Sequence, residues 1–391
     1  MPKPLISRLA PRSRTTTATA ALLALATLGA GCSDPFLQRE RGRAISVDQR
    51  AQQFEVPHER YAELGYRLDW RGFPGTGASM RVLGLDVRED GTVAVIENSS
   101  TVSLLEGDTG RLRWQNRIAT DLTRLHGVTH GPNGRVVAIS EADFFFLDQS
   151  TGELVDRQSL STLANTMPVL EGPVAIYGTS TGRIATHLMT RGLPLWAFGS
   201  RGSFEANPVR IGDAIGAISR AGEIVFVRAG DGDLLGRTRI FGGTEPGVHP
   251  VASDNVFYVA SLDQSVYAFD TSGGQVWRHR TSTPLRNQPM LLDGVLYVTT
   301  EQGLTALDGA RGDVLWAASD IVGDVIGVRR GRLIVWDHAA RSVTLVDPAD
   351  GGVETRVHLP GVHMLRLSRA VDGDLYAVSE TAVVAKFLPT R

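Results

Sequence analysis

The segment LTALDGARGDVLW, Leu304 to Trp316, gives the clearest indication of the fold. Its apolar opening is followed by Asp308 and Gly312, and Trp316 stands four residues after the glycine. An aspartate side chain can bond to turn backbone, and a glycine supplies the positive φ that closes a tight loop. The stretch therefore predicts a β-hairpin, with a short apolar strand before the turn and a second strand after it.

The same turn recurs along the chain. Its glycines are separated by 42, 40, 40, 42, 38 and 39 residues; they are Gly110, Gly152, Gly192, Gly232, Gly274, Gly312 and Gly351. Short strands that repeat with a period near 40 are typical of a β-propeller, in which each repeat forms one four-stranded blade. The pattern predicts an all-β fold.

The last repeat lacks its outer strand. Three strands fit between Gly351 and the end of the chain, whereas the segment YRLDW, Tyr66 to Trp70, has the pattern of a strand that follows a turn. We expect this N-terminal strand to complete the last blade and close the ring, which removes exposed sheet edges. The prediction is an eight-bladed propeller over residues 66–391, with seven blades as the alternative.

Five tryptophans stand at one position after the turns: Trp70, Trp114, Trp196, Trp277 and Trp316. A buried tryptophan contributes a large apolar surface and needs one acceptor for its N–H. We interpret the set as structural residues that dock neighbouring blades, in preference to a stacked cofactor. Asp156, Gly236 and Thr355 replace tryptophan in the other repeats.

A second periodic feature precedes the innermost strands. Prolines open these strands in the middle repeats, as expected for a residue without an N–H, and a polar residue lies shortly before each one: Asn165, Asn207, His249 and Asn287. They are interpreted either as caps at strand starts, which asparagine and histidine suit, or as a rim at the channel mouth that binds a ligand or partner. We favour the caps.

The N-terminus has the pattern of a leader peptide. Basic residues precede an apolar run that ends in LGAGC, and Cys32 is the only cysteine. The motif resembles the lipobox of bacterial lipoproteins, although Leu28 stands one residue too early, so an ordinary secretory signal is the alternative. We expect a signal peptide at 1–31, lipidation of Cys32, a tether at 32–65 with a short helix between Pro57 and Gly65, and the propeller at 66–391.

Catalytic and metal-binding patterns are weak. His126 and His130 are four residues apart, as in a helical pair of metal ligands, but their surroundings predict a strand. The two DGD segments are interpreted as turns between strands in preference to cation sites. Neither a G-x-S-x-G elbow nor a phosphate loop occurs. A net charge of -2 argues against a nucleic-acid partner. The sequence predicts no catalytic residue, no metal ligand and no cofactor.

The unit from Ala306 to Trp316, with near copies ending at Trp114 and Trp277, resembles the PQQ-like propeller repeat. That superfamily includes quinoprotein dehydrogenases, which have long pocket-building insertions, and lipoproteins of the BamB type. Short connections, the single cysteine and Ser33 after it favour the second group. The resemblance implies a non-catalytic scaffold of the bacterial cell envelope, anchored in the outer membrane, facing the periplasm and binding another envelope protein in β-barrel assembly. The alternative is a periplasmic oxidoreductase-like protein that holds PQQ or another small ligand.

Overall fold

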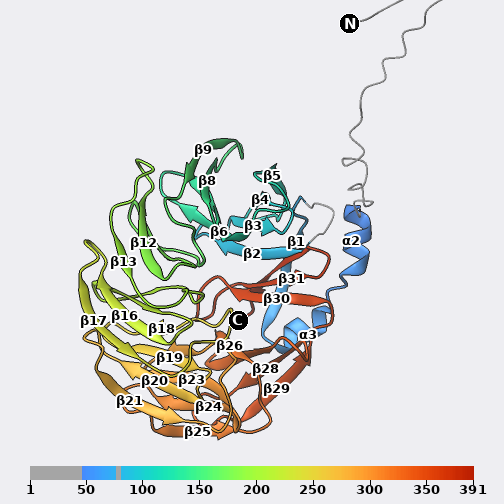
Figure 1. Cartoon of the computed structure of the whole chain (residues 1–391). Helices are drawn as coiled ribbons and strands as arrows, with labels where there is room; N and C mark the ends of the chain where they lie inside the picture. Colours follow the sequence, from blue (N-terminus) through green and yellow to red (C-terminus); the bar gives the residue numbers. More distant parts are fainter. Residues whose placement is uncertain (1–45, 76–80) are drawn as a thin grey trace, which may run out of the picture. The chain divides into compact units, whose positions relative to one another are not determined.

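The computed structural model describes residues 46–75 and 81–391. The predicted leader and Cys32 lie outside these residues. Within the unit that runs from Arg43 to Arg391, eight four-stranded antiparallel sheets are arranged in a ring (Figure 1). The architecture is an eight-bladed β-propeller, as predicted.

Seven blades are built from consecutive strands, numbered here from the innermost to the outermost. Blade 1 contains β2 (Val82–Val87), β3 (Val93–Glu97), β4 (Thr101–Leu105) and β5 (Leu112–Arg117). Blade 2 contains β6 (Leu125–Gly131), β7 (Arg135–Ser140), β8 (Asp143–Asp148) and β9 (Leu154–Ser159). Blade 3 contains β10 (Val169–Glu171), β11 (Val174–Gly178), β12 (Arg183–Leu188) and β13 (Ala197–Gly199). Blade 4 contains β14 (Val209–Ile211), β15 (Ala214–Ile218), β16 (Glu223–Arg228) and β17 (Leu234–Arg239).

The second half of the ring repeats this order. Blade 5 contains β18 (Val251–Ala252), β19 (Phe257–Ser261), β20 (Ser265–Phe269) and β21 (Gln275–Arg280). Blade 6 contains β22 (Met290–Leu292), β23 (Val295–Thr300), β24 (Gly303–Asp308) and β25 (Val314–Ala318). Blade 7 contains β26 (Asp324–Arg329), β27 (Arg332–Asp337), β28 (Ser342–Val346) and β29 (Val353–His358).

Blade 8 joins the two ends of the propeller sequence. Its inner strands are β30 (Val362–Leu367), β31 (Leu375–Ser379) and β32 (Val384–Pro389), and its outer strand is β1 (Tyr66–Gly72). β1 runs antiparallel to β32, with Tyr66 opposite Pro389 and Gly72 opposite Val384. The predicted closure by the N-terminal strand is confirmed, and the seven-blade alternative is excluded.

The core lies between the blades. The buried apolar side chains of the described residues form eight clusters, and each cluster joins a pair of neighbouring blades. The middle strands of a blade are buried on both faces, as β3 and β4 show. Two-sided burial explains why apolar residues stand at successive positions in such strands, as in VAVI of β3, since alternation marks strands with one wet face.

Two short helices precede β1. α2 (Val47–Gln53) begins with a capping box formed by Ser46 and Gln49, and α3 (His58–Glu63) follows Pro57. Tyr61 of α3 stacks on Phe387 with ring centroids 3.8 Å apart and belongs to the core cluster of blades 7 and 8. The segment expected to be a tether therefore packs against the ring over its described part, because its apolar residues complete that cluster.

The two faces of the ring differ in their connections. Each outermost strand runs on to the innermost strand of the next blade, and the antiparallel order places these connections on one face, here called the loop face. The opposite face, here called the turn face, carries the hairpins between first and second strands and those between third and fourth strands. In the described part of the chain, neither helix is long and apolar enough to span a membrane.

Candidate functional site

Four of the five predicted docking tryptophans lie on outermost strands, and Trp196 directly precedes β13; each of the five contacts the turn glycine of the following blade. A Cβ atom added to Gly312 would stand 2.5 Å from the Trp277 ring, and one added to Gly110 would stand 2.3 Å from the Trp70 ring. The pairs Trp114–Gly152, Trp196–Gly232 and Trp316–Gly351 repeat this contact. Each turn glycine thus serves two ends: its positive φ closes the turn, and its missing side chain makes room for an indole.

The indole N–H groups strengthen these contacts. Four of them donate to a backbone carbonyl in the next blade's turn: Trp70 to Gly107, Trp114 to Gln149, Trp277 to Gly309 and Trp316 to Pro348, at 2.8–2.9 Å. Within residues 46–75 and 81–391, the buried N–H of Trp196 has no hydrogen-bond partner. Blade 3 is therefore joined to blade 4 by ring packing alone at this position.

The predicted rim residues lie on the loop face, where their polar groups link neighbouring blades. Asn207 Oδ1 accepts from the backbone N–H of Met167 at 3.0 Å, and His249 Nδ1 accepts from the N–H of Asn207 at 3.2 Å. Asn165 Nδ2 donates to the carbonyl of Phe204 at 2.6 Å. Burial lowers the pKa of His249, which is consistent with a neutral ring whose Nδ1 is an acceptor.

The hydrogen bonds between neighbouring blades continue to blade 7 through Gln288, a residue that the sequence pattern did not indicate. The N–H of His249 donates to Gln288 Oε1 at 2.8 Å, and the N–H of Gln288 donates to Asp324 Oδ1 at 3.0 Å. Asn287 donates to the same Asp324 oxygen at 3.0 Å. Gln288 could have been identified from its position, because it directly precedes Pro289 as His249 directly precedes Pro250. These bonds favour the structural interpretation of the set over a ligand rim.

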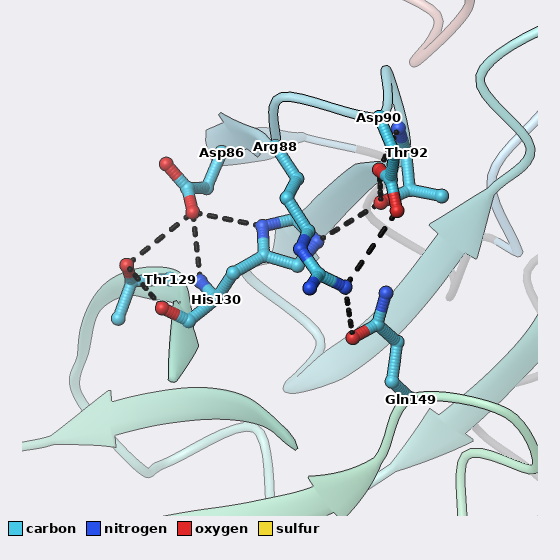
Figure 2. A network of polar contacts seen from close by, with 7 residues as sticks. All are labelled: Asp86, Arg88, Asp90, Thr92, Thr129, His130 and Gln149. Carbon is cyan, nitrogen blue, oxygen red and sulfur yellow. Dashed lines mark hydrogen bonds and ion pairs between the residues drawn. The ribbon is translucent and has the colours of Figure 1, made fainter. Parts of the chain in front are cut away.

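A polar network joins blades 1 and 2 on their innermost strands (Figure 2). Asp86 Oδ2 accepts from the backbone N–H of His130 at 2.7 Å and from the ring Nδ1 at 2.9 Å. Burial alone would raise the pKa of Asp86, but the hydrogen bonds from His130 outweigh it and lower that pKa. Arg88 extends the network across the turn face by donating to Gln149 Oε1 at 2.8 Å.

The Asp86, His130 and Thr92 side chains are arranged in the order of a nucleophilic triad. The hydroxyl of Thr92 is 3.5 Å from His130 Nε2, however, and it donates to Asp90 Oδ1 at 2.6 Å. Thr92 is also buried, so its oxygen is shielded from a substrate. The arrangement is suited to holding two blades together.

Beside this network, a cavity of about 550 Å³ opens on the turn face between blades 8 and 1. Its wall carries both signs of charge, with Arg88 and Arg369 near Glu89 and Asp374. Among the described residues, no group of three or more His, Cys, Asp or Glu side chains is placed to hold a metal ion. His126 and His130, which have helical spacing in the sequence, lie on strand β6.

Apolar side chains project from the loop face. Leu122 is 94% exposed on the loop between β5 and β6, and Phe241 is 96% exposed on the loop between β17 and β18. Leu163 and Val322 are also exposed on loops of this face. A single exposed leucine is ordinary, but an almost fully exposed phenylalanine on a loop is not.

Comparisons with known proteins agree with this geometry. BamB from Moraxella catarrhalis is 20% identical, with a TM-score of 0.61 over 78% of this chain and 96% of that chain. The computationally designed protein Ika8 is 11% identical, with a TM-score of 0.67 over 82% and 99% of the two chains. The C-terminal WD40 domain of Sif2 is 10% identical, with a TM-score of 0.63 over 83% and 98%. At these identities the structures show the propeller fold alone.

A search of curated protein sequences gave no match. A family model described as outer membrane protein assembly factor BamB matches residues 98–244 and 220–385. The two matches overlap and together cover six of the blades completely and about half of each of the other two. The chain therefore belongs to the BamB family of PQQ-like β-propellers.

Proposed function

We propose that the protein is a non-catalytic scaffold of the bacterial cell envelope that binds another envelope protein through its loop face and acts in outer-membrane β-barrel assembly. The observation that carries the proposal is the exposure of Leu122 and Phe241 on loops of a closed ring. Family membership supports the assembly role.

The physical argument rests on where these side chains lie. Loops on a rigid scaffold are the usual carriers of binding residues, because they can vary without disturbing the core. Aromatic side chains are enriched among the residues that dominate interface energies. Phe241 stands at the start of residues 240–250, the longest connection of the loop face, and it makes no contribution to the buried core.

The proposal includes a lipid anchor at Cys32 after removal of residues 1–31. Acylation of this cysteine would hold the ring at the outer membrane, facing the periplasm. A Cys32→Ser variant is expected to move from the membrane fraction to the soluble periplasmic fraction. Retention of that variant in the membrane fraction would contradict the anchor and leave the binding face to be tested separately.

The binding face is tested with Leu122→Ser and Phe241→Ser, singly and together, by crosslinking and co-purification from solubilised envelopes. Because both side chains are exposed, we expect unfolding free energies within about 0.5 kcal/mol of wild type. Leu154→Ser is the matched control, since Leu154 is an exposed leucine on the outermost strand β9, away from the loops. We expect the loop variants to lose the partner and the control to retain it. Equal recovery by all variants would refute the proposed face.

A further inference from the structure

The interface between blades 2 and 3 lacks the indole that five other interfaces contain. Asp156 takes the tryptophan position: it lies opposite Phe146 in the strand register, as Trp316 lies opposite Ala306. At the turn glycine of blade 3, Gly192, the atoms nearest to an added Cβ belong to the Gln158 side chain, at 3.5 Å. Gln158 takes over the hydrogen bond of the missing indole by donating to the carbonyl of Met189 at 2.8 Å.

The other two interfaces without tryptophan are closed by different groups. At blade 4, the turn of blade 5 lies against Gly236, so that a Cβ atom on this glycine would stand 2.1 Å from the backbone of Ser272. At blade 7, the buried Arg329 side chain approaches the glycine that precedes β1 and donates to the carbonyl of Gly65 at 3.0 Å. A cavity of about 170 Å³ remains there, with Glu63, Arg330, Arg332 and Glu354 among its lining residues.

At blade 2, Gln158 replaces the hydrogen bond but does not fill the space. A cavity of about 220 Å³ remains, several times the roughly 30 Å³ share of one water. Phe146, Val155 and Met189 form its apolar wall, and Asp156 and Arg135 supply a carboxylate and a guanidinium. Half-exposed Val155 keeps the cavity open to the outside of the ring.

We propose that this cavity is a binding site for a tryptophan side chain of a protein partner. At five other interfaces one of the chain's own indoles packs on the next blade's turn. Here Gln158 lies against the turn glycine Gly192, and the cavity opens beside it, against Met189 and Thr190 of the same turn. Phe146 and Met189 offer the aromatic and sulfur contacts that suit an indole ring. The identification of the partner as an envelope protein rests on the proposed function. The binding of a tryptophan side chain in the cavity does not depend on it.

Polar groups at the cavity favour tryptophan over an aliphatic side chain. The Asp156 carboxylate, which already accepts from Gln158 Nε2 at 2.7 Å, has further lone pairs for an indole N–H. Arg135, paired with Asp148 at 3.0 Å, supplies a cation to the electron-rich face of the ring. An aliphatic group would leave both interactions unused.

The test uses N-acetyl-tryptophanamide as the probe and ligand-observed NMR with purified protein. We expect saturable binding by wild type, with N-acetyl-leucinamide at least roughly tenfold weaker. Asp156→Trp is expected to abolish binding, because the chain's own indole then occupies the cavity. Thr355→Trp is the position-matched control, since Arg329 already occupies that interface, and it should leave binding unchanged.

A second variant covers the case in which Asp156→Trp fails to fold. Val155→Glu changes a half-exposed side chain at the cavity, so it should fold and should weaken binding roughly tenfold. Equal binding of the two amides, or undiminished binding by Val155→Glu, would overturn the proposal. The probe requires no partner, so failure of this pocket and failure of the loop-face scaffold give separate results.

Discussion

Lys386 is the single lysine of the propeller, the other lysine being Lys3 in the leader. Its ammonium stands 3.5 Å from both Asp69 and Asp374 and donates to the carbonyl of Gly107 at 3.1 Å. The contacts join β32 to β1 within blade 8 and join blade 8 to blade 1. Replacing this lysine should therefore loosen the point at which the ring closes.

The magnitude follows from the exposure of the three groups. Removing one partner of a fully buried ion pair costs about 3–5 kcal/mol, whereas an exposed pair contributes about 0–1 kcal/mol. Lys386 is 10% exposed, but Asp69 and Asp374 are 25% and 29% exposed, so water screens part of the loss. We expect Lys386→Met to lower the unfolding free energy by about 2 kcal/mol, an intermediate value.

The assay is urea unfolding together with amide hydrogen exchange of β1 and β32. Arg117→Met is the control, because Arg117 pairs with Asp121 at 2.7 Å while both side chains are about half exposed. Exchange should accelerate in the closing strands for Lys386→Met and stay unchanged for the control. Adding Asp69→Asn and Asp374→Asn should recover part of the loss, since no unpaired carboxylate then remains. Equal destabilisation by Lys386→Met and Arg117→Met would contradict a special role of Lys386 in closing the ring.

Two further predictions concern the contacts between blades. Gly312→Ala should cost at least about 2 kcal/mol in urea unfolding, because the added Cβ meets Trp277 at 2.5 Å, whereas Gly134→Ala, which has positive φ but open space, should cost about 1 kcal/mol. Burial lowers the pKa of His249, so its contribution to stability is present above pH 6.5 and is lost as pH falls from there toward the folded-state pKa. Thermal unfolding across this range should show a smaller pH slope for His249→Asn, which keeps an acceptor for Asn207.

The architecture could be predicted from the sequence because the repeat is local. Turn glycines at a period near 40 fix the blade length, and the YRLDW segment shows which end supplies the missing strand. Both features can be recognised from a few neighbouring residues, because they depend on local backbone conformation. The closure by β1 followed from counting strands, since an unpaired edge in blade 8 would otherwise remain.

The contacts between blades were harder to predict, because they depend on residues far apart in the sequence. Asn287 was chosen for its residue type, whereas Gln288 makes the bond to the backbone of His249. The segment with Tyr61 was expected to be a tether because it is polar on average. Its few apolar residues nevertheless complete the core of blades 7 and 8, which average composition does not reveal.

The departures from the repeat show why position alone does not determine a site. Three blades lack the docking tryptophan, yet their interfaces differ because the neighbouring turn or side chain differs. Restoring the indole by Asp156→Trp should raise the unfolding free energy while closing the pocket, since the space is already present. The same change at Gly236 should destabilise the ring, because the Ser272 backbone lies where the side chain would go. Opposite signs at equivalent positions would show that blade 2 keeps an open cavity at a cost in stability, as expected where a repeat is modified for binding.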